Sequence, residues 1–69
     1  MTGPSFGHIE ARARIVGEMA FTCLQLSRDL GDGSMVRTCK VVISTLRKGL
    51  IPLESDVRAL HRYLRSAFR

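Results

Sequence analysis

Two interleaved series of residues, one apolar and one basic, occupy the C-terminal part of the chain. The apolar series comprises Leu53, Val57, Leu60 and Leu64, and the basic series comprises Arg58, Arg62, Arg65 and Arg69. Both have helical spacing, and 3.6 residues per turn places them on different faces of an α-helix. The pattern predicts a helix from about residue 52 to residue 68, beginning at Pro52. It predicts one buried face and an opposite face of fixed positive charge, here named the arginine face.

An earlier helix is predicted over residues 8–30. Its apolar stripe comprises Ile9, Ala13, Val16, Ala20, Cys23, Ser27 and Leu30. Further apolar residues widen this stripe until residues 15–26 are apolar on most sides, whereas a single neighbouring helix covers only one stripe. This helix therefore either lies between two other helices or contacts a second copy of the chain. We expect a homodimer, because small cores commonly need self-association.

Between these two helices, the segment Gly31-Asp32-Gly33 predicts a turn, with Asp32 or Ser34 capping the helix that follows. Residues 35–48 carry apolar residues at helical spacing and end in cations beside Gly49, as is typical of a helix C-terminus. The β-branched residues within 38–45 favour a strand as the alternative. A helix is preferred because both ends carry helix signals and no second strand is available for pairing.

The predicted fold class is therefore all-α. It consists of a helical hairpin followed by a C-terminal amphipathic helix, with neighbouring helices roughly antiparallel. Residues 1–7 are expected to form a flexible N-terminal tail, and residues 8–69 a single helical domain. The 69 residues allow one modest core, and the 45% hydrophobic content is too high for a disordered chain.

The chain has 11 Lys and Arg residues against 6 Asp and Glu residues, a formal net charge of +5. This charge favours anionic partners, although small domains also carry such a charge for solubility. No apolar run exceeds three residues, so no segment is expected to span a membrane. The start of the chain lacks the pattern of a secretion signal, and a cytoplasmic location is expected.

Cys23 and Cys39 lie equally far from Gly31, so a hairpin would place them at similar heights on facing helices. A disulfide is conceivable, but both cysteines occupy apolar stripes, and we expect two reduced, buried thiols. Together with His8 and His61, the two cysteines are four residues of the types that bind zinc in Cys2His2 sites. Structural zinc sites usually pair ligands two to four residues apart, which these four residues do not do. We therefore expect no metal site.

No catalytic residues are predicted either. The chain has no nucleophile elbow, phosphate-binding loop or paired-carboxylate motif, and three short helices leave little room for a substrate pocket. An enzyme and a bound cofactor are therefore not expected.

The arginine face has three interpretations: a solvated surface, a docking surface for an acidic protein, or a contact with nucleic acid. For protein docking, the predicted contact residues are Arg58, Arg62, Arg65, Arg69 and Tyr63. For DNA binding, residues 35–65 would act as a helix-turn-helix. Basic residues of the second helix would extend the patch, namely Arg37, Lys40, Arg47 and Lys48. However, Glu54 and Asp56 would repel phosphates there, so DNA binding ranks second and a membrane-surface helix third.

The small size and the lack of catalytic motifs resemble, at the level of class only, small helical regulators of phages, plasmids and bacterial operons. No specific residues carry this resemblance. It implies stoichiometric binding to a protein such as a transcription factor, as an anti-activator or adaptor. We therefore expect a homodimeric regulatory protein with an acidic protein partner, and a dimeric DNA-binding protein is the alternative.

Overall fold

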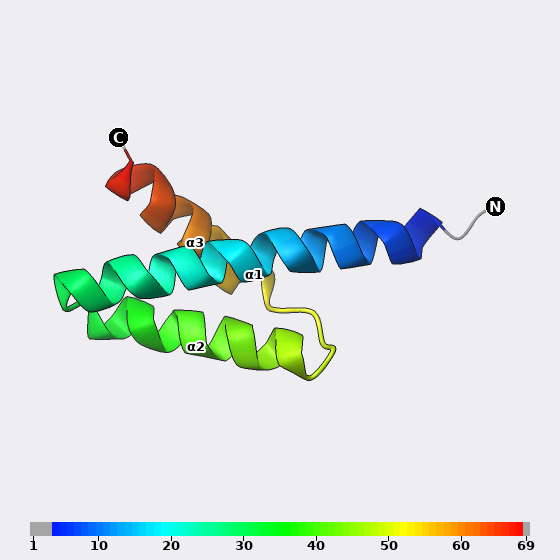
Figure 1. The fold of residues 1–69 in the computed structure, drawn as a ribbon, viewed down its shortest axis with the longest axis horizontal. Helices are drawn as coiled ribbons and strands as arrows, with labels where there is room; N and C mark the ends of the chain where they lie inside the picture. The colour runs from blue at the N-terminus through cyan, green and yellow to red at the C-terminus, as the bar shows by residue number, and fades with distance from the viewer. Residues whose placement is uncertain (1–3, 69) are drawn as a thin grey trace.

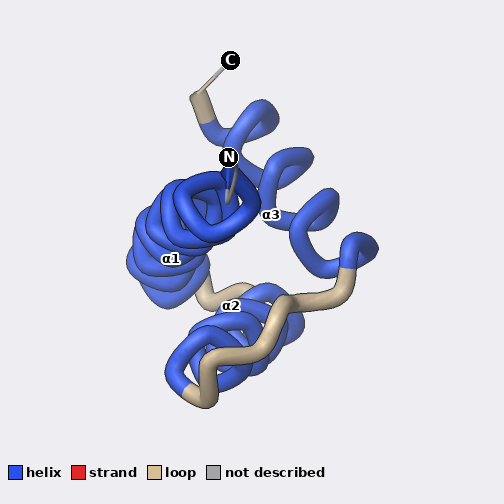
Figure 2. The backbone as a smooth tube through the Cα atoms, turned by 90° about the vertical axis from the view of Figure 1, so that its right-hand side faces the viewer, coloured by secondary structure: helices blue, strands red, loops and turns tan. Residues whose placement is uncertain are grey.

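The computed structural model describes the backbone of residues 4–68 and the side chains of residues 11–68. The chain folds into three helices, α1 (Pro4–Leu30), α2 (Gly33–Arg47) and α3 (Glu54–Ala67), and residues 4–68 contain no strand (Figure 1). The predicted all-α class is therefore confirmed, and the strand alternative for residues 38–45 is wrong. α2 runs back along α1, and α3 crosses the hairpin, so that the three helices surround a common interior (Figure 2).

α1 begins four residues earlier than predicted. Pro4 is its first residue, so residues 4–7, which were assigned to the tail, are helical. Proline is well suited to the first helical turn, because its φ is already helical and the N–H that it lacks would have no partner there. The rest of the predicted tail, residues 1–3, lies outside the described residues.

α1 and α2 both end in a glycine-based cap. Gly31 has φ +71° and Gly49 has φ +76°, in the left-handed region that favours glycine. At the first cap, the Asp32 N–H donates to the Ser27 carbonyl at 2.8 Å. At the second, the Leu50 N–H donates to the Thr45 carbonyl at 3.1 Å. Together with the glycine N–H bonds, these contacts form Schellman motifs, as the turn residues predicted.

Asp32 also begins the next helix. Its Oδ1 accepts a hydrogen bond from the Met35 N–H at 3.1 Å, so Asp32, and not Ser34, is the N-cap of α2. At α3, the prediction that Pro52 is the first helical residue is wrong. Leu53 is the N-cap, with extended backbone (ψ 140°), and α3 begins only at Glu54.

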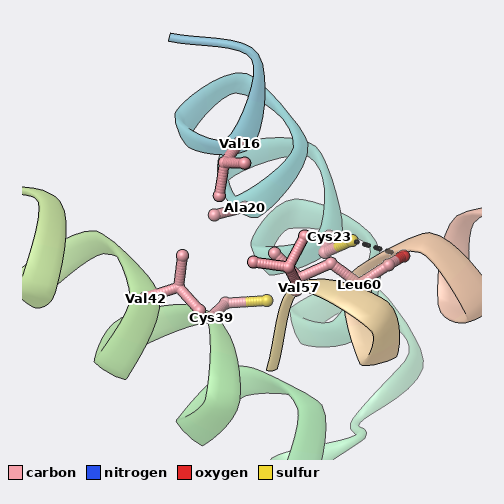
Figure 3. Close-up of a cluster of buried hydrophobic side chains, with 7 residues drawn as sticks. All are labelled: Val16, Ala20, Cys23, Cys39, Val42, Val57 and Leu60. Carbon is pink, nitrogen blue, oxygen red and sulfur yellow. Dashed lines mark hydrogen bonds between the residues drawn. The ribbon is translucent and has the colours of Figure 1, made fainter. Parts of the chain in front are cut away.

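Each helix contributes to a small core (Figure 3). Its buried members are Val16, Ala20 and Cys23 from α1, Cys39 and Val42 from α2, and Val57 and Leu60 from α3. Ser27 continues the α1 stripe and is also buried, with its hydroxyl donating to the Leu24 carbonyl at 3.1 Å. The core is built by the predicted stripes except at their ends. Leu30 is 71% exposed where α1 ends, and Leu53 is 69% exposed because it precedes α3.

α1 contacts both other helices, yet much apolar surface stays exposed. The large exposed hydrophobic residues are Ile15, Phe21, Leu30, Val41, Leu50, Ile51, Leu53 and Phe68. The described part of the chain contains no helix with the length and apolar character needed to cross a bilayer. The apolar excess in α1 is therefore only partly buried by the packing of α1 against α2 and α3.

Candidate functional site

The structure describes three members of the arginine face, Arg58, Arg62 and Arg65, and Arg69 lies outside the described residues. All three are exposed, while Val57 and Leu60 on the same helix are buried. Arg58 and Arg65 are seven residues apart, about 10 Å along the helix axis, so the three guanidinium groups form a short row. The core contacts of α3 fix the direction in which this row faces.

No carboxylate neutralises this row within the described side chains. The ion pair found there joins Arg12 Nη2 of α1 to Glu54 Oε2 of α3 at 2.9 Å, and both side chains are about 60% exposed. Such an exposed pair contributes little to stability. The pair does, however, hold the Glu54 carboxylate, at the start of α3, against Arg12 of α1. The three described arginines therefore lie free of internal ion pairs with described residues.

Tyr63 does not share the arginine face. It is half-buried, packs against the core, and its hydroxyl oxygen is buried without a hydrogen-bond partner among the described residues. Burial raises the pKa of Tyr63, and the negative charge of Asp32 raises it further. The side chain thus faces the α1–α2 hairpin, so the structure places the predicted contact residue against the interior.

The basic residues of α2 group with α1 instead of α3. A surface hollow of about 370 Å³ lies along one side of the α1–α2 hairpin; we name it the hairpin groove. It is lined by Phe21, Leu24, Arg28, Lys40, Ile43, Ser44 and Arg47, and by no residue of α3. Lys40 and Arg47 therefore line a surface to which α3 contributes no residue. Which α1 residues face α2 depends on tertiary packing, so periodicity within one helix could not reveal this groove.

A second hollow lies near the other end of the hairpin. It has a volume of about 380 Å³ and is bounded by α1, the segment linking α2 to α3, and the first turns of α3; we name it the end groove. Its lining is Arg12, Ala13, Val16, Leu46, Gly49, Leu50, Ile51, Pro52, Glu54 and Val57. Apart from the Arg12–Glu54 pair this surface is apolar, and Leu50 and Ile51 are 59% and 74% exposed.

Cys23 and Cys39 are free thiols buried in the core. The Cys23 thiol donates a long hydrogen bond to the Leu60 carbonyl at 3.7 Å (Figure 3). Burial, followed by the neighbouring Cys39, raises the pKa of Cys23 to about 11, and burial also raises the pKa of Cys39. Both thiols are thus held in the neutral form, the opposite of what a reactive nucleophile or a metal ligand requires.

Within the described side chains, no three His, Cys, Asp or Glu residues lie close enough to share a metal ion. The side chain of His8, one of the four residues considered for zinc, lies outside the described part.

Comparisons with known proteins found no matching family model, no similar curated protein and no similar solved structure.

Proposed function

We propose that this protein is a small, non-enzymatic regulator that acts by stoichiometric binding to a protein partner such as a transcription factor. The arginine face is the contact, and an acidic surface of the partner is its target. The observation that carries this proposal is the exposed row of Arg58, Arg62 and Arg65, which has no ion-pair partner among the described residues.

The chemistry of the row suits a carboxylate-rich surface. A guanidinium group presents planar, paired donors that bind carboxylates in bidentate geometry, and such charge-assisted bonds are stronger than neutral ones. Because Val57 and Leu60 anchor α3 in the core, the helix positions the donors before a partner arrives. Tyr63 supports this arrangement from the interior side of α3.

We further propose that the protein acts as a homodimer through the end groove. Leu50 and Ile51 leave large apolar side chains in water beside this groove. Because Arg12 and Glu54 pair with each other at its edge, the rim carries no excess charge to repel an identical surface. Burying this surface against a second copy would supplement a core that has seven hydrophobic members.

DNA binding remains the second candidate, since a row of arginines also neutralises phosphates. The ion pair between Glu54 and Arg12 favours DNA binding. Glu54 is one of the two carboxylates expected to repel phosphates, and Arg12 of α1 partly neutralises its charge. Asp56 still lies in the first turn of α3, and no arginine of the face has an amide side chain beside it for reading bases.

The deciding variant is Arg62→Glu/Arg65→Glu. Its matched control is Arg14→Glu/Arg37→Glu, which makes the same change in net charge at exposed positions of α1 and α2. Affinity capture from the native host, followed by mass spectrometry, should recover the same protein partner with wild type and control. The α3 variant should lose it while keeping its helix content by circular dichroism. Full retention of that partner by the α3 variant would refute the proposal.

A gel shift with random-sequence duplex separates the two candidates. Phosphate neutralisation gives binding that is nearly independent of sequence and that falls steeply as salt rises. Sub-micromolar retention at low salt that collapses with added salt, and is lost in the α3 variant, would favour the DNA-binding alternative. No retention at tens of micromolar protein removes that alternative.

A further inference from the structure

The hairpin groove combines an apolar floor with positive charge at its margins. Phe21, Leu24 and Ile43 supply the apolar part, and Phe21 is 52% exposed. The charged side chains lining the groove are Arg28, Lys40 and Arg47, all exposed, and its lining includes no carboxylate. The lining therefore carries three positive charges around a surface that remains partly in water.

The register of the hairpin fixes how these charges are spaced. The closest side-chain atom to a Cβ built on Gly17 is Leu46 Cδ1, at 3.7 Å, so residue 17 of α1 lies level with the end of α2. Arg47 is thus near one end of the groove. Arg28 lies eleven residues beyond Gly17 along α1, a distance of about 16 Å. Arg47 and Arg28 therefore lie toward the two ends, with Phe21, Lys40 and Ile43 between them.

We propose that the hairpin groove binds a short acidic amphipathic helix of a protein partner. About 16 Å corresponds to three helical turns. The bound helix carries large apolar side chains in its middle turns, which cover Phe21 and Ile43. It carries Asp or Glu residues toward both ends, which pair with Arg28 and Arg47, and a further acidic residue that pairs with Lys40 on the α2 side. Helix-in-groove recognition of this kind uses apolar anchors spaced three or four residues apart.

Charge decides against a second copy of this chain as the occupant. The chain has a net charge of +5 and only six carboxylate side chains. Of these, Asp32 caps α2 and Glu54 pairs with Arg12. A duplex nucleic acid fits less well, because phosphates would pair with the cations but leave the apolar floor without apolar cover. An acidic amphipathic helix satisfies both features.

This surface is separate from the arginine face, since no α3 residue lines it. The inference therefore goes beyond the proposed function and does not depend on it.

Fluorescence anisotropy with a synthetic peptide tests the inference. The probe is a labelled 15-residue peptide, about four turns of helix, with leucines on one face of its middle turns and glutamates flanking them. Its control is a scrambled peptide of the same composition, which has the same charge and no apolar face. We expect wild-type protein to bind the amphipathic peptide and to bind the scrambled peptide at least about tenfold more weakly.

Protein variants locate the contact. Lys40→Glu/Arg47→Glu and Phe21→Ala should each weaken binding about tenfold or more, because they remove the charge and the apolar contact respectively. Arg62→Glu/Arg65→Glu should leave it within about twofold, since those residues face elsewhere. In heteronuclear NMR spectra, the largest peptide-induced shifts should lie at the lining residues of α1 and α2.

Four outcomes would overturn the inference. They are no binding of the amphipathic peptide, equal binding of the scrambled peptide, equal weakening by the α3 variant, and displacement of the peptide by random duplex DNA that itself binds through Lys40 and Arg47. Because the two double variants act on different surfaces, failure here is distinguishable from failure of the proposed function. Phe21→Ala keeps the test valid if the charge reversal disturbs folding, since Phe21 is half-exposed.

Discussion

Gly17 lies in the middle of α1, where this helix passes the end of α2. A Cβ added at Gly17 would meet Leu46 Cδ1 at 3.7 Å, which is ordinary van der Waals contact, and φ at this residue is not positive. Glycine inside a helix costs about 1 kcal/mol relative to alanine, mainly through the flexibility of the unfolded chain. We therefore expect Gly17→Ala to raise the free energy of unfolding by about 1 kcal/mol.

That change is measurable in a protein of this size. Domains have stabilities of roughly 0.05–0.15 kcal/mol per residue, which corresponds to about 3–10 kcal/mol here. An increase of about 1 kcal/mol should raise the melting temperature by about 4–8 °C. Urea and thermal unfolding followed by far-UV circular dichroism check this. Gly17→Ala and wild type must be compared at one protein concentration, because self-association would make stability depend on concentration.

The same substitution at Gly31 should have the opposite sign and serves as the control. No atom lies within 4 Å of a Cβ built there, but φ is +71°, where an L-residue is strained. Left-handed backbone costs a non-glycine residue roughly 1–2 kcal/mol, so Gly31→Ala should lower stability by about that amount. A lower melting temperature for Gly17→Ala would show that α1 and α2 approach more closely than the 3.7 Å contact implies. A neutral Gly31→Ala would contradict the described turn.

Two further predictions concern the end groove and the buried thiols. Ile51→Glu should convert the dimer to a monomer in sedimentation equilibrium while leaving helix content unchanged, whereas Arg14→Glu should not; a monomeric wild type would refute dimerisation. Burial raises the pKa of Cys23 from 9.0 to about 11, so between these values the folded protein retains a proton that the unfolded chain has lost. The contribution of Cys23 to the free energy of unfolding is therefore fully present below pH 9, and it falls as the pH rises toward 11. Urea unfolding across this range should show a smaller decline for Cys23→Ala, and an equal decline in both proteins would contradict the prediction.

The sequence predicted the three helices because their signals are local. Apolar spacing identified the buried positions in the helix interiors, and the glycines at 31 and 49 marked the C-terminal ends of α1 and α2. Burial was predicted wrongly at positions where the apolar spacing continues but no neighbouring helix is present to cover the side chain. Leu30 and Leu53 match their stripes, yet each lies beyond the packed part of its helix and stays exposed.

The arginine face could be predicted for the same reason, since its members belong to one helix. The two grooves could not. Each combines residues from different elements, and which residues meet depends on how far α1 is shifted along α2. Tyr63 is a different kind of error. It follows the buried Leu60 by three residues, so helical spacing places it toward the core, and its assignment to the arginine face rested only on its position next to Arg62 in the sequence.

The two proposed contact surfaces differ in their relation to the core, and this difference has a thermodynamic consequence. The described members of the arginine face are exposed, and none of them belongs to the core. A partner bound there therefore contacts side chains that folding has already positioned. The hairpin groove includes Leu24 and Ile43, which also pack against the core. A ligand in that groove covers side chains that hold α1 and α2 together, and it requires the two helices to be paired. Any ligand that binds only the folded state stabilises it. In the groove, the surface covered by a ligand includes the partly exposed margin of the core, so occupancy should oppose local separation of α1 from α2. Recognition at α3 and recognition at the hairpin are therefore separable by charge reversal, and only the second covers side chains that also hold the hairpin together.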